Sequence, residues 1–330
     1  MNMNEWLASA ASKHKAFPIL SYPGAVMLGV PVGDMVRNGE LQAKCMKAIA
    51  GRYDMLASVS LMDLSVEAEA FGSPVRFSGD EVPTVTGAII GEGDSPDKLP
   101  VPEVGAARTG EYIRAIGLAK DLITHIPVFA GSIGPFSLGG RLMDMSEIMV
   151  LCYTEPELVH AVLEKAADFL IRYNTALRDA GADGLVMAEP AAGLLSPALI
   201  EEFSTPYVNQ IIRAVETDEF AVVYHNCGNT IPLIESILKT GARAFHFGNA
   251  VELSQMLELM PPDRLVMGNV DPAGQLRSGT PESVKNETLR VLESCSKYDN
   301  FIISSGCDVP PLAPAENIEA FFATVEAFYR

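Results

Sequence analysis

The sequence predicts an α/β protein in which residues 1–330 form a single (β/α)8 TIM barrel with an N-terminal helical extension. Short apolar runs of strand length alternate along the chain with longer amphipathic stretches, which is typical of a parallel sheet covered by helices. Eight such runs are present, and this barrel needs eight strands. Because periodicity does not show whether a sheet closes, an open doubly wound sheet is the alternative.

The expected strands are short and mostly apolar. They are the runs 17–22, 54–60, 126–132, 183–190, 220–225, 242–248, 264–270 and 300–306. Two amphipathic stretches, 146–181 and 280–299, are expected to be helical, and the second opens with Thr-Pro, a common start of a helix. The Pro- and Gly-rich segment 91–110 is expected to be a surface excursion rather than a domain boundary.

The composition argues against nucleic acid and anionic membranes as binding partners. The chain has 330 residues, 48% of them hydrophobic, and a formal net charge of −18. Nucleic-acid binding depends on clustered Lys and Arg, which the sequence lacks, and an anionic membrane surface is disfavoured for the same reason. No apolar stretch reaches the length of a membrane span, and the first 17 residues lack the pattern of a secretory signal.

The cysteines indicate a reducing compartment. Their number is odd and they are widely separated, which is not a disulfide framework. We therefore expect a cytoplasmic protein, and a homo-oligomer is compatible with the sequence. The five are Cys45, Cys152, Cys227, Cys295 and Cys307.

A histidine and a cysteine, two residue types that bind metals, lie at the end of the apolar run 220–225 and just after it. Side chains alternate along a strand, so His225 and Cys227 emerge on the same side, and Gly228 lets the backbone turn away. The alternative is a hydrogen-bonded core histidine beside a small apolar cysteine. Cys307 directly follows the run 300–306. If the barrel forms, the loops after its strands share one rim, and the three side chains meet there.

Five segments of the chain resemble the uroporphyrinogen decarboxylase superfamily in order and spacing, and the resemblance extends from about residue 40 to the C-terminus. The segments are 61–77, 126–138, 181–207, 266–272 and 304–322. The H-x-C-G pattern at 225–228 and the Gly-Cys pair at 306–307 resemble one branch, the zinc-containing methylcobamide:coenzyme M methyltransferases and related corrinoid-dependent methyltransferases. In that branch these residues hold zinc, so the resemblance implies that His225, Cys227 and Cys307 are Zn²⁺ ligands.

The sequence departs from the decarboxylase pattern at several positions. The segment 17–29 has no Arg where that enzyme holds substrate carboxylates, and the position of its catalytic Tyr falls near Arg141. Its substrate-contacting Ser falls near Pro190, and its C-terminal His falls at Cys307. Asp63 does match its central Asp. One shared carboxylate does not make a porphyrinogen site, so decarboxylase activity is not expected.

Three ligands predict a zinc site with an open fourth position. Two thiolates and one imidazole balance the charge of Zn²⁺ and fill three of its four tetrahedral positions, as in catalytic zinc sites. His246 and Glu189 are the candidates for a fourth protein ligand, with core packing or hydrogen bonding as their alternative roles. A thiol entering the open position would lose its proton.

Further residues are expected around the zinc. Asp308 either orients a zinc ligand or caps a turn, and Met187 is expected to fill the core. Gly131, Gly134 and Pro135 are expected to shape the loop after the run 126–132. Arg141 could anchor an anion such as a sulfonate, or form a surface salt bridge, while Asn269 and Asp271 contact substrate or form a turn. The expected substrate-binding residues are Asp63, Glu189, Asn269, Asp271 and Arg141.

The methyl donor is expected on another protein. The chain lacks the D-x-H-x-x-G corrinoid-binding motif, because Asp121 and His125 have the wrong separation. The sequence therefore predicts a zinc-dependent methyltransferase that moves a methyl group between a methylcobamide on a separate corrinoid protein and a thiol such as coenzyme M. One alternative passes methyl groups from a methoxylated or methylthio substrate to the corrinoid protein. Another is a non-catalytic, zinc-stabilised barrel that docks that protein.

Overall fold

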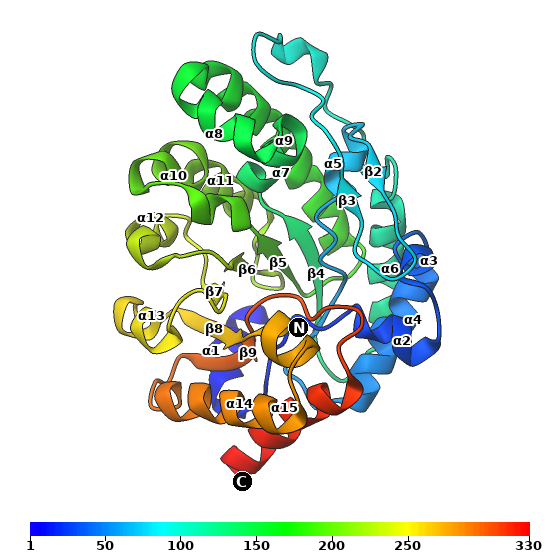
Figure 1. The fold of residues 1–330 in the computed structure, drawn as a ribbon, viewed down its shortest axis with the longest axis vertical. Helices are drawn as coiled ribbons and strands as arrows, with labels where there is room; N and C mark the ends of the chain where they lie inside the picture. The colour runs from blue at the N-terminus through cyan, green and yellow to red at the C-terminus, as the bar shows by residue number, and fades with distance from the viewer.

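A curled, parallel sheet of seven strands occupies the centre of the protein, and helices surround it (Figure 1). The computed structural model describes residues 1–330. Neighbouring strands follow the order β1-β4-β5-β6-β7-β8-β9, and all pairs are parallel. The strands are β1 (Ser58–Val59), β4 (Val128–Ile133), β5 (Gly184–Ala188), β6 (Ala221–Asn226), β7 (Ala244–Phe247), β8 (Leu265–Val270) and β9 (Phe301–Ser305).

The sequence predicted these seven strands because their residues are buried on both faces. Every residue of β4 to β9 is buried, so each strand is a nearly continuous apolar run, as in parallel sheets covered by helices. The expected strand 54–60 is wrong in extent, since β1 has only two residues. A separate antiparallel pair, β2 (Val75–Arg76) and β3 (Thr84–Val85), was not predicted.

The prediction of a strand at 17–22 is wrong. The segment 16–19 lies between β9 and β1: the Phe17 N–H donates to the Ile303 carbonyl at 3.0 Å, and the Leu56 N–H donates to the Ala16 carbonyl at 2.9 Å. Pro18 has no N–H to continue a ladder. The next N–H, of Ile19, donates to the Ser305 hydroxyl at 3.1 Å instead of a backbone carbonyl.

The helices begin and end at recognisable sequence signals. The expected helix 146–181 is divided into α8 (Met145–Thr154) and α9 (Pro156–Asp179), because Pro156 occupies the first position of a new helix. The expected helix 280–299 is confirmed as α14 (Pro281–Cys295), and Thr280 and Ser283 form a reciprocal capping box at its start. No helix combines the length and apolar character that crossing a membrane requires.

The remaining helices complete the outer layer and the two ends of the sheet. They are α1 (Met3–Ala10), α2 (Pro23–Leu28), α3 (Val32–Met35), α4 (Gly39–Arg52), α5 (Val66–Ala70), α6 (Thr109–Leu122), α7 (Pro135–Met143), α10 (Pro197–Phe203), α11 (Thr205–Val215), α12 (Ile234–Leu238), α13 (Leu253–Leu259) and α15 (Ala315–Tyr329). Short helical turns are η1 (Ala11–Lys13), η2 (Pro96–Lys98), η3 (Pro190–Leu194), η4 (Ile231–Leu233) and η5 (Pro272–Arg277).

Helix α1, the expected N-terminal helical extension, covers the N-terminal end of the sheet. Its Trp6 packs against Phe17 and Phe129 inside the sheet, with ring centroids 6.3 and 5.5 Å away. The Met3 N–H donates to the carbonyl of Asp218, just before β6. Apolar side chains therefore fill the interior of the sheet at this end.

Candidate metal centre

Three side chains far apart in the sequence meet at the C-terminal ends of β6 and β9. His225 belongs to β6, Cys227 follows it, and Cys307 lies two residues after β9. One ligand atom from each lies within 4.8 Å of the other two, and Cys307 Sγ is 3.5 Å from His225 Nε2. His225 is buried, whereas both cysteines are partly exposed. The sequence predicted this meeting from a shared rim, and the structure places the residues accordingly.

The spacing of these atoms fits a single zinc ion. Bonds of about 2.3 Å to sulfur and about 2.05 Å to nitrogen, at a tetrahedral angle, place the two ligand atoms about 3.6 Å apart. The 3.5 Å between Cys307 Sγ and His225 Nε2 agrees with that value. Two thiolates and one imidazole are also a donor set typical of zinc. The donor set and this distance therefore suit zinc, and Cys227 lies close enough to share the ion.

The pKa values of the two thiols shift in opposite directions. The hydrogen bond from Cys307 lowers the pKa of Cys227 against the opposing effect of burial. The same hydrogen bond, together with burial and the negative charge on Cys227, raises the pKa of Cys307 well above its usual value. These opposite shifts favour the thiolate at Cys227 and the thiol at Cys307. Binding of a divalent cation would release the second proton.

Two residues that sequence reasoning missed hold the loop carrying Cys227. The Asn226 side chain donates to the Glu189 carbonyl at 2.8 Å and accepts from the Gly228 N–H at 2.9 Å. Gly248, directly after β7, leaves space for the loop, because a Cβ there would lie 2.5 Å from Cys227 Cα. The only sequence signal for this role is a glycine at the end of an apolar run.

The two candidates for a fourth protein ligand make other contacts. His246 Nδ1 lies 2.8 Å from His225 Nδ1, on the side of the ring away from Cys307. The buried Glu189 carboxylate accepts from the N–H groups of Phe136 and Ser137, both at 2.8 Å, and so caps the start of α7. Neither belongs to the three-residue group.

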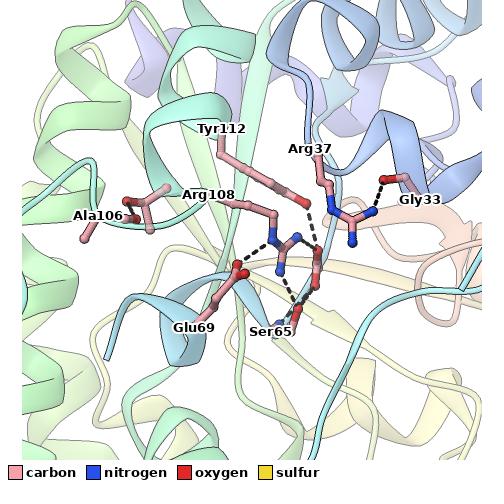
Figure 2. Close-up of polar contacts among 9 residues, drawn as sticks. Gly33, Arg37, Ser65, Glu69, Ala106, Arg108 and Tyr112 are labelled. Carbon is pink, nitrogen blue, oxygen red and sulfur yellow. Dashed lines mark hydrogen bonds and ion pairs between the residues drawn. The ribbon is translucent and has the colours of Figure 1, made fainter. Parts of the chain in front are cut away.

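Asp63 is the shared acceptor of a buried polar network. Figure 2 shows its partners Ser65, Arg108 and Tyr112. Its Oδ2 accepts from Arg108 and, at 2.9 Å, from the Tyr112 hydroxyl. Its Oδ1 accepts from the Ser65 hydroxyl at 2.6 Å and from the Ser65 N–H at 3.1 Å. Arg108 also pairs with Glu69. Protein donors therefore occupy both oxygens of this carboxylate.

Arg141, by contrast, has an unpaired guanidinium beside the metal centre. A cavity of about 330 Å³ is lined by Arg141 and Cys227, with Leu64, Met145 and Leu194 among its apolar walls. Arg141 forms none of the protein's ion pairs, and burial lowers its pKa. A cation in an apolar cavity attracts an anionic group more strongly than one exposed to water.

The other predicted residues lie at the C-terminal ends of the strands: Asn269 is in β8, and Asp271 and Asp308 follow β8 and β9. Asn269 donates to the carbonyls of Gly248 and Val251 at 3.0 and 2.8 Å. Asp271 Oδ1 accepts from the Ala273 and Gly274 N–H groups and so caps η5. Burial raises the pKa of Asp308 well above its usual value, and its Oδ1 lacks a hydrogen-bond partner.

Packing explains the remaining residues that the sequence singled out in β4, β5 and the loop after β4. Gly134 has no room for a side chain, because a Cβ would lie 2.4 Å from Glu189 Oε2. Pro135 begins α7. Gly131 and Met187 are buried in β4 and β5, so packing explains both.

Comparison with known proteins assigns the chain to a family. Residues 18–328 match the family model described as uroporphyrinogen decarboxylase (URO-D). The chain belongs to the URO-D family. A methylcobamide:CoM methyltransferase of Methanosarcina acetivorans is 27% identical over 262 residues, covering 78% of this chain and 75% of that protein. A uroporphyrinogen decarboxylase of Neisseria meningitidis serogroup C is 26% identical over 309 residues, covering 90% and 85%.

A solved structure shares the fold of this chain. It is described as a methyltransferase from Methanosarcina mazei, and it superposes with a TM-score of 0.88 over 100% of both chains at 23% sequence identity. At 23% identity, the match establishes the architecture of this URO-D-family chain and not its chemistry.

Proposed function

We propose that the chain is a zinc-dependent methyltransferase that moves a methyl group between a methylcobamide on a separate corrinoid protein and a small thiol such as coenzyme M. The observation that carries the proposal is the group of two thiols and one imidazole, spaced for one tetrahedral ion. Similarity to a methylcobamide:CoM methyltransferase supports the reaction.

His225, Cys227 and Cys307 would hold the ion and leave one position for a substrate. When bound, zinc would supply a Lewis acid that lowers the pKa of a thiol in that position. The two cysteines neutralise the charge of the ion, so electron density stays on the substrate sulfur. His246 and Glu189 remain outside the ligand set, because each is engaged by other protein groups.

The cavity beside Cys227 would bind and orient the thiol. Its volume of about 330 Å³ suits a small molecule. A short thiol can place its sulfur next to Cys227 while an anionic tail reaches Arg141. Leu64, Met145 and Leu194 form apolar walls beside the space between, which strengthens the attraction between the tail and the guanidinium.

The transfer then requires only a methyl donor at the rim. The substrate sulfur forms a bond to the methyl carbon, the bond from carbon to cobalt breaks, and the cobalt of the corrinoid keeps the electron pair. The thiol proton passes to solvent. Exposed apolar side chains on the loops after β5 and β9, Leu194 at 71% and Leu312 at 45%, suit contact with a corrinoid ring or its carrier.

We also propose that segment 16–19 takes the place of the eighth strand and closes a (β/α)8 barrel. Its hydrogen bonds to Ile303 on one side and to Leu56 on the other support this closure. Closure would bring the loop after β9 next to the first loops of the chain, which completes the rim around the metal centre.

The experiment is a methyl-transfer assay with the zinc-loaded protein. Methylcobalamin is mixed with mercaptoethanesulfonate, 2-mercaptoethanol or ethanethiol, and the loss of its visible spectrum is followed. We expect the sulfonate to react fastest, and chelation or Cys307→Ser to abolish the reaction. If no thiol reacts while a methoxylated compound methylates cob(I)alamin, the transfer runs in the other direction. If zinc is held by four protein ligands and neither reaction occurs, the protein is a docking barrel.

A further inference from the structure

Two buried histidines touch each other behind the metal centre. His225 Nδ1 and His246 Nδ1 are 2.8 Å apart, and the ring centroids are 4.7 Å apart at an interplanar angle of 72°. The residues are in register on neighbouring strands β6 and β7, and both are buried, with 2% and 0% exposure. Two ring nitrogens at this distance need one hydrogen between them, so one donates and the other accepts.

Backbone carbonyls at both ends fix which nitrogen donates. His225 Nδ1 also lies 3.2 Å from the carbonyl oxygen of His246, which only accepts, so this nitrogen carries the hydrogen. On the other side, the Ser304 hydroxyl donates to the carbonyl of Phe17 at 2.7 Å. Ser304 has no second hydrogen. It therefore accepts from His246 Nε2, which lies 2.7 Å away.

The chain of donors leaves one nitrogen free. His246 carries its hydrogen on Nε2, so its Nδ1 accepts from His225 Nδ1–H. His225 Nε2 then has the lone pair, and this is the nitrogen that lies 3.5 Å from Cys307 Sγ. The lone pair faces the two sulfurs before any metal is present.

We propose that His246 and Ser304 are positioning residues that hold His225 in its Nδ1–H tautomer and thereby prepare Nε2 as a metal ligand. The inference rests on the metal-dependent function proposed above. The relay crosses the interior of the sheet, from β6 and β7 through β9 to Phe17 in segment 16–19. Removing a group that orients a metal-bound histidine typically weakens metal binding about 10- to 100-fold.

Neighbouring serines of β9 provide a matched pair of variants. Ser304 and Ser305 are both fully buried. The Ser305 hydroxyl accepts from the Ile19 N–H, and its side chain is not among the hydrogen-bond partners of either histidine ring. Zn²⁺ affinity is measured by competition with a chromophoric chelator. We expect Ser304→Ala to weaken it about tenfold or more, and Ser305→Ala to leave it within about twofold although it removes a similar hydrogen bond.

Variants of His246 test the acceptor itself. His246→Phe removes it and should weaken Zn²⁺ binding about 10- to 100-fold. His246→Asn places an amide oxygen where Nδ1 stood and should recover most of the loss. Equal affinity in the two variants, or an equal loss in Ser304→Ala and Ser305→Ala, would overturn the proposal.

The tautomer is measured directly in the metal-free protein. The chain has five histidines, so nitrogen NMR of histidine-labelled protein resolves each ring, and His225→Asn assigns one of them. We expect the Nδ1–H pattern for His225 and the Nε2–H pattern for His246. An Nε2–H pattern for His225 would contradict the relay. If the protein binds no zinc, the proposed function fails while this spectrum still decides the tautomer.

Discussion

Replacing Asp63 by Asn separates a structural role of this residue from contact with substrate. The Asp63 side chain is fully buried, and its oxygens accept from Arg108, Tyr112 and Ser65. Breaking a buried ion pair from one side costs about 3–5 kcal/mol. Because Glu69 still pairs with Arg108, and because the Asn oxygen still accepts hydrogen bonds, the lower part of this range applies. We expect a loss of about 3 kcal/mol in the free energy of unfolding.

The assay combines urea unfolding with methyl-transfer kinetics at a temperature where the variant is folded. We expect the KM for the thiol to change less than about threefold, since Asp63 has no free oxygen to offer. Glu69→Gln is the matched control. Its side chain is 23% exposed, so we expect a loss of about 1 kcal/mol or less. A KM more than about tenfold higher for Asp63→Asn, with unchanged stability, would refute this reasoning and assign Asp63 to the substrate.

Three further predictions address the loop, the pocket and the core. Gly248→Ala should weaken zinc binding in a chelator competition, because its Cβ would displace Cys227; unchanged affinity would show that the loop adapts. Arg141→Gln should raise the KM for mercaptoethanesulfonate about 10- to 100-fold but not that for ethanethiol, as expected for loss of a charged hydrogen bond; equal effects on both thiols would exclude an anion anchor. Burial raises the pKa of Glu67 to about 7 from 4.5, so the folded state binds the proton more tightly. The stability of the natural protein relative to Glu67→Gln should therefore be greatest below pH 4.5 and fall by about 3 kcal/mol as pH rises through 7; a flat difference in urea unfolding would contradict the shift.

The apolar pattern predicted most of the sheet, because strands buried on both faces appear in the sequence as continuous runs of apolar residues. The helix caps were also visible, as at Thr280. The segment after Ala16 misled the prediction, because its apolar residues are as buried as those of a strand. Pro18 removes the N–H that a ladder needs, and Ser305, remote in sequence, supplies the replacement partner.

The metal ligands were predictable for a different reason than their neighbours. His225 and Cys227 are two residues apart and so share a direction, and parallel strands bring Cys307 to the same edge. The partners of His246 could not be predicted, since Ser304 reaches it across the interior from a strand that is not its neighbour in the sheet. Asp63 shows the same difficulty, because its motif identifies the carboxylate but not Arg108, which occupies it.

The coordination of bound zinc tests the central claim most directly. X-ray absorption at the zinc edge is recorded for the loaded protein with and without mercaptoethanesulfonate. Without thiol we predict two sulfur ligands at about 2.3 Å, one imidazole nitrogen and one further oxygen or nitrogen; with thiol we predict three sulfurs. A shell of four protein ligands that the thiol leaves unchanged, or a spectrum that Cys307→Ser does not alter, would contradict an open site built from His225, Cys227 and Cys307.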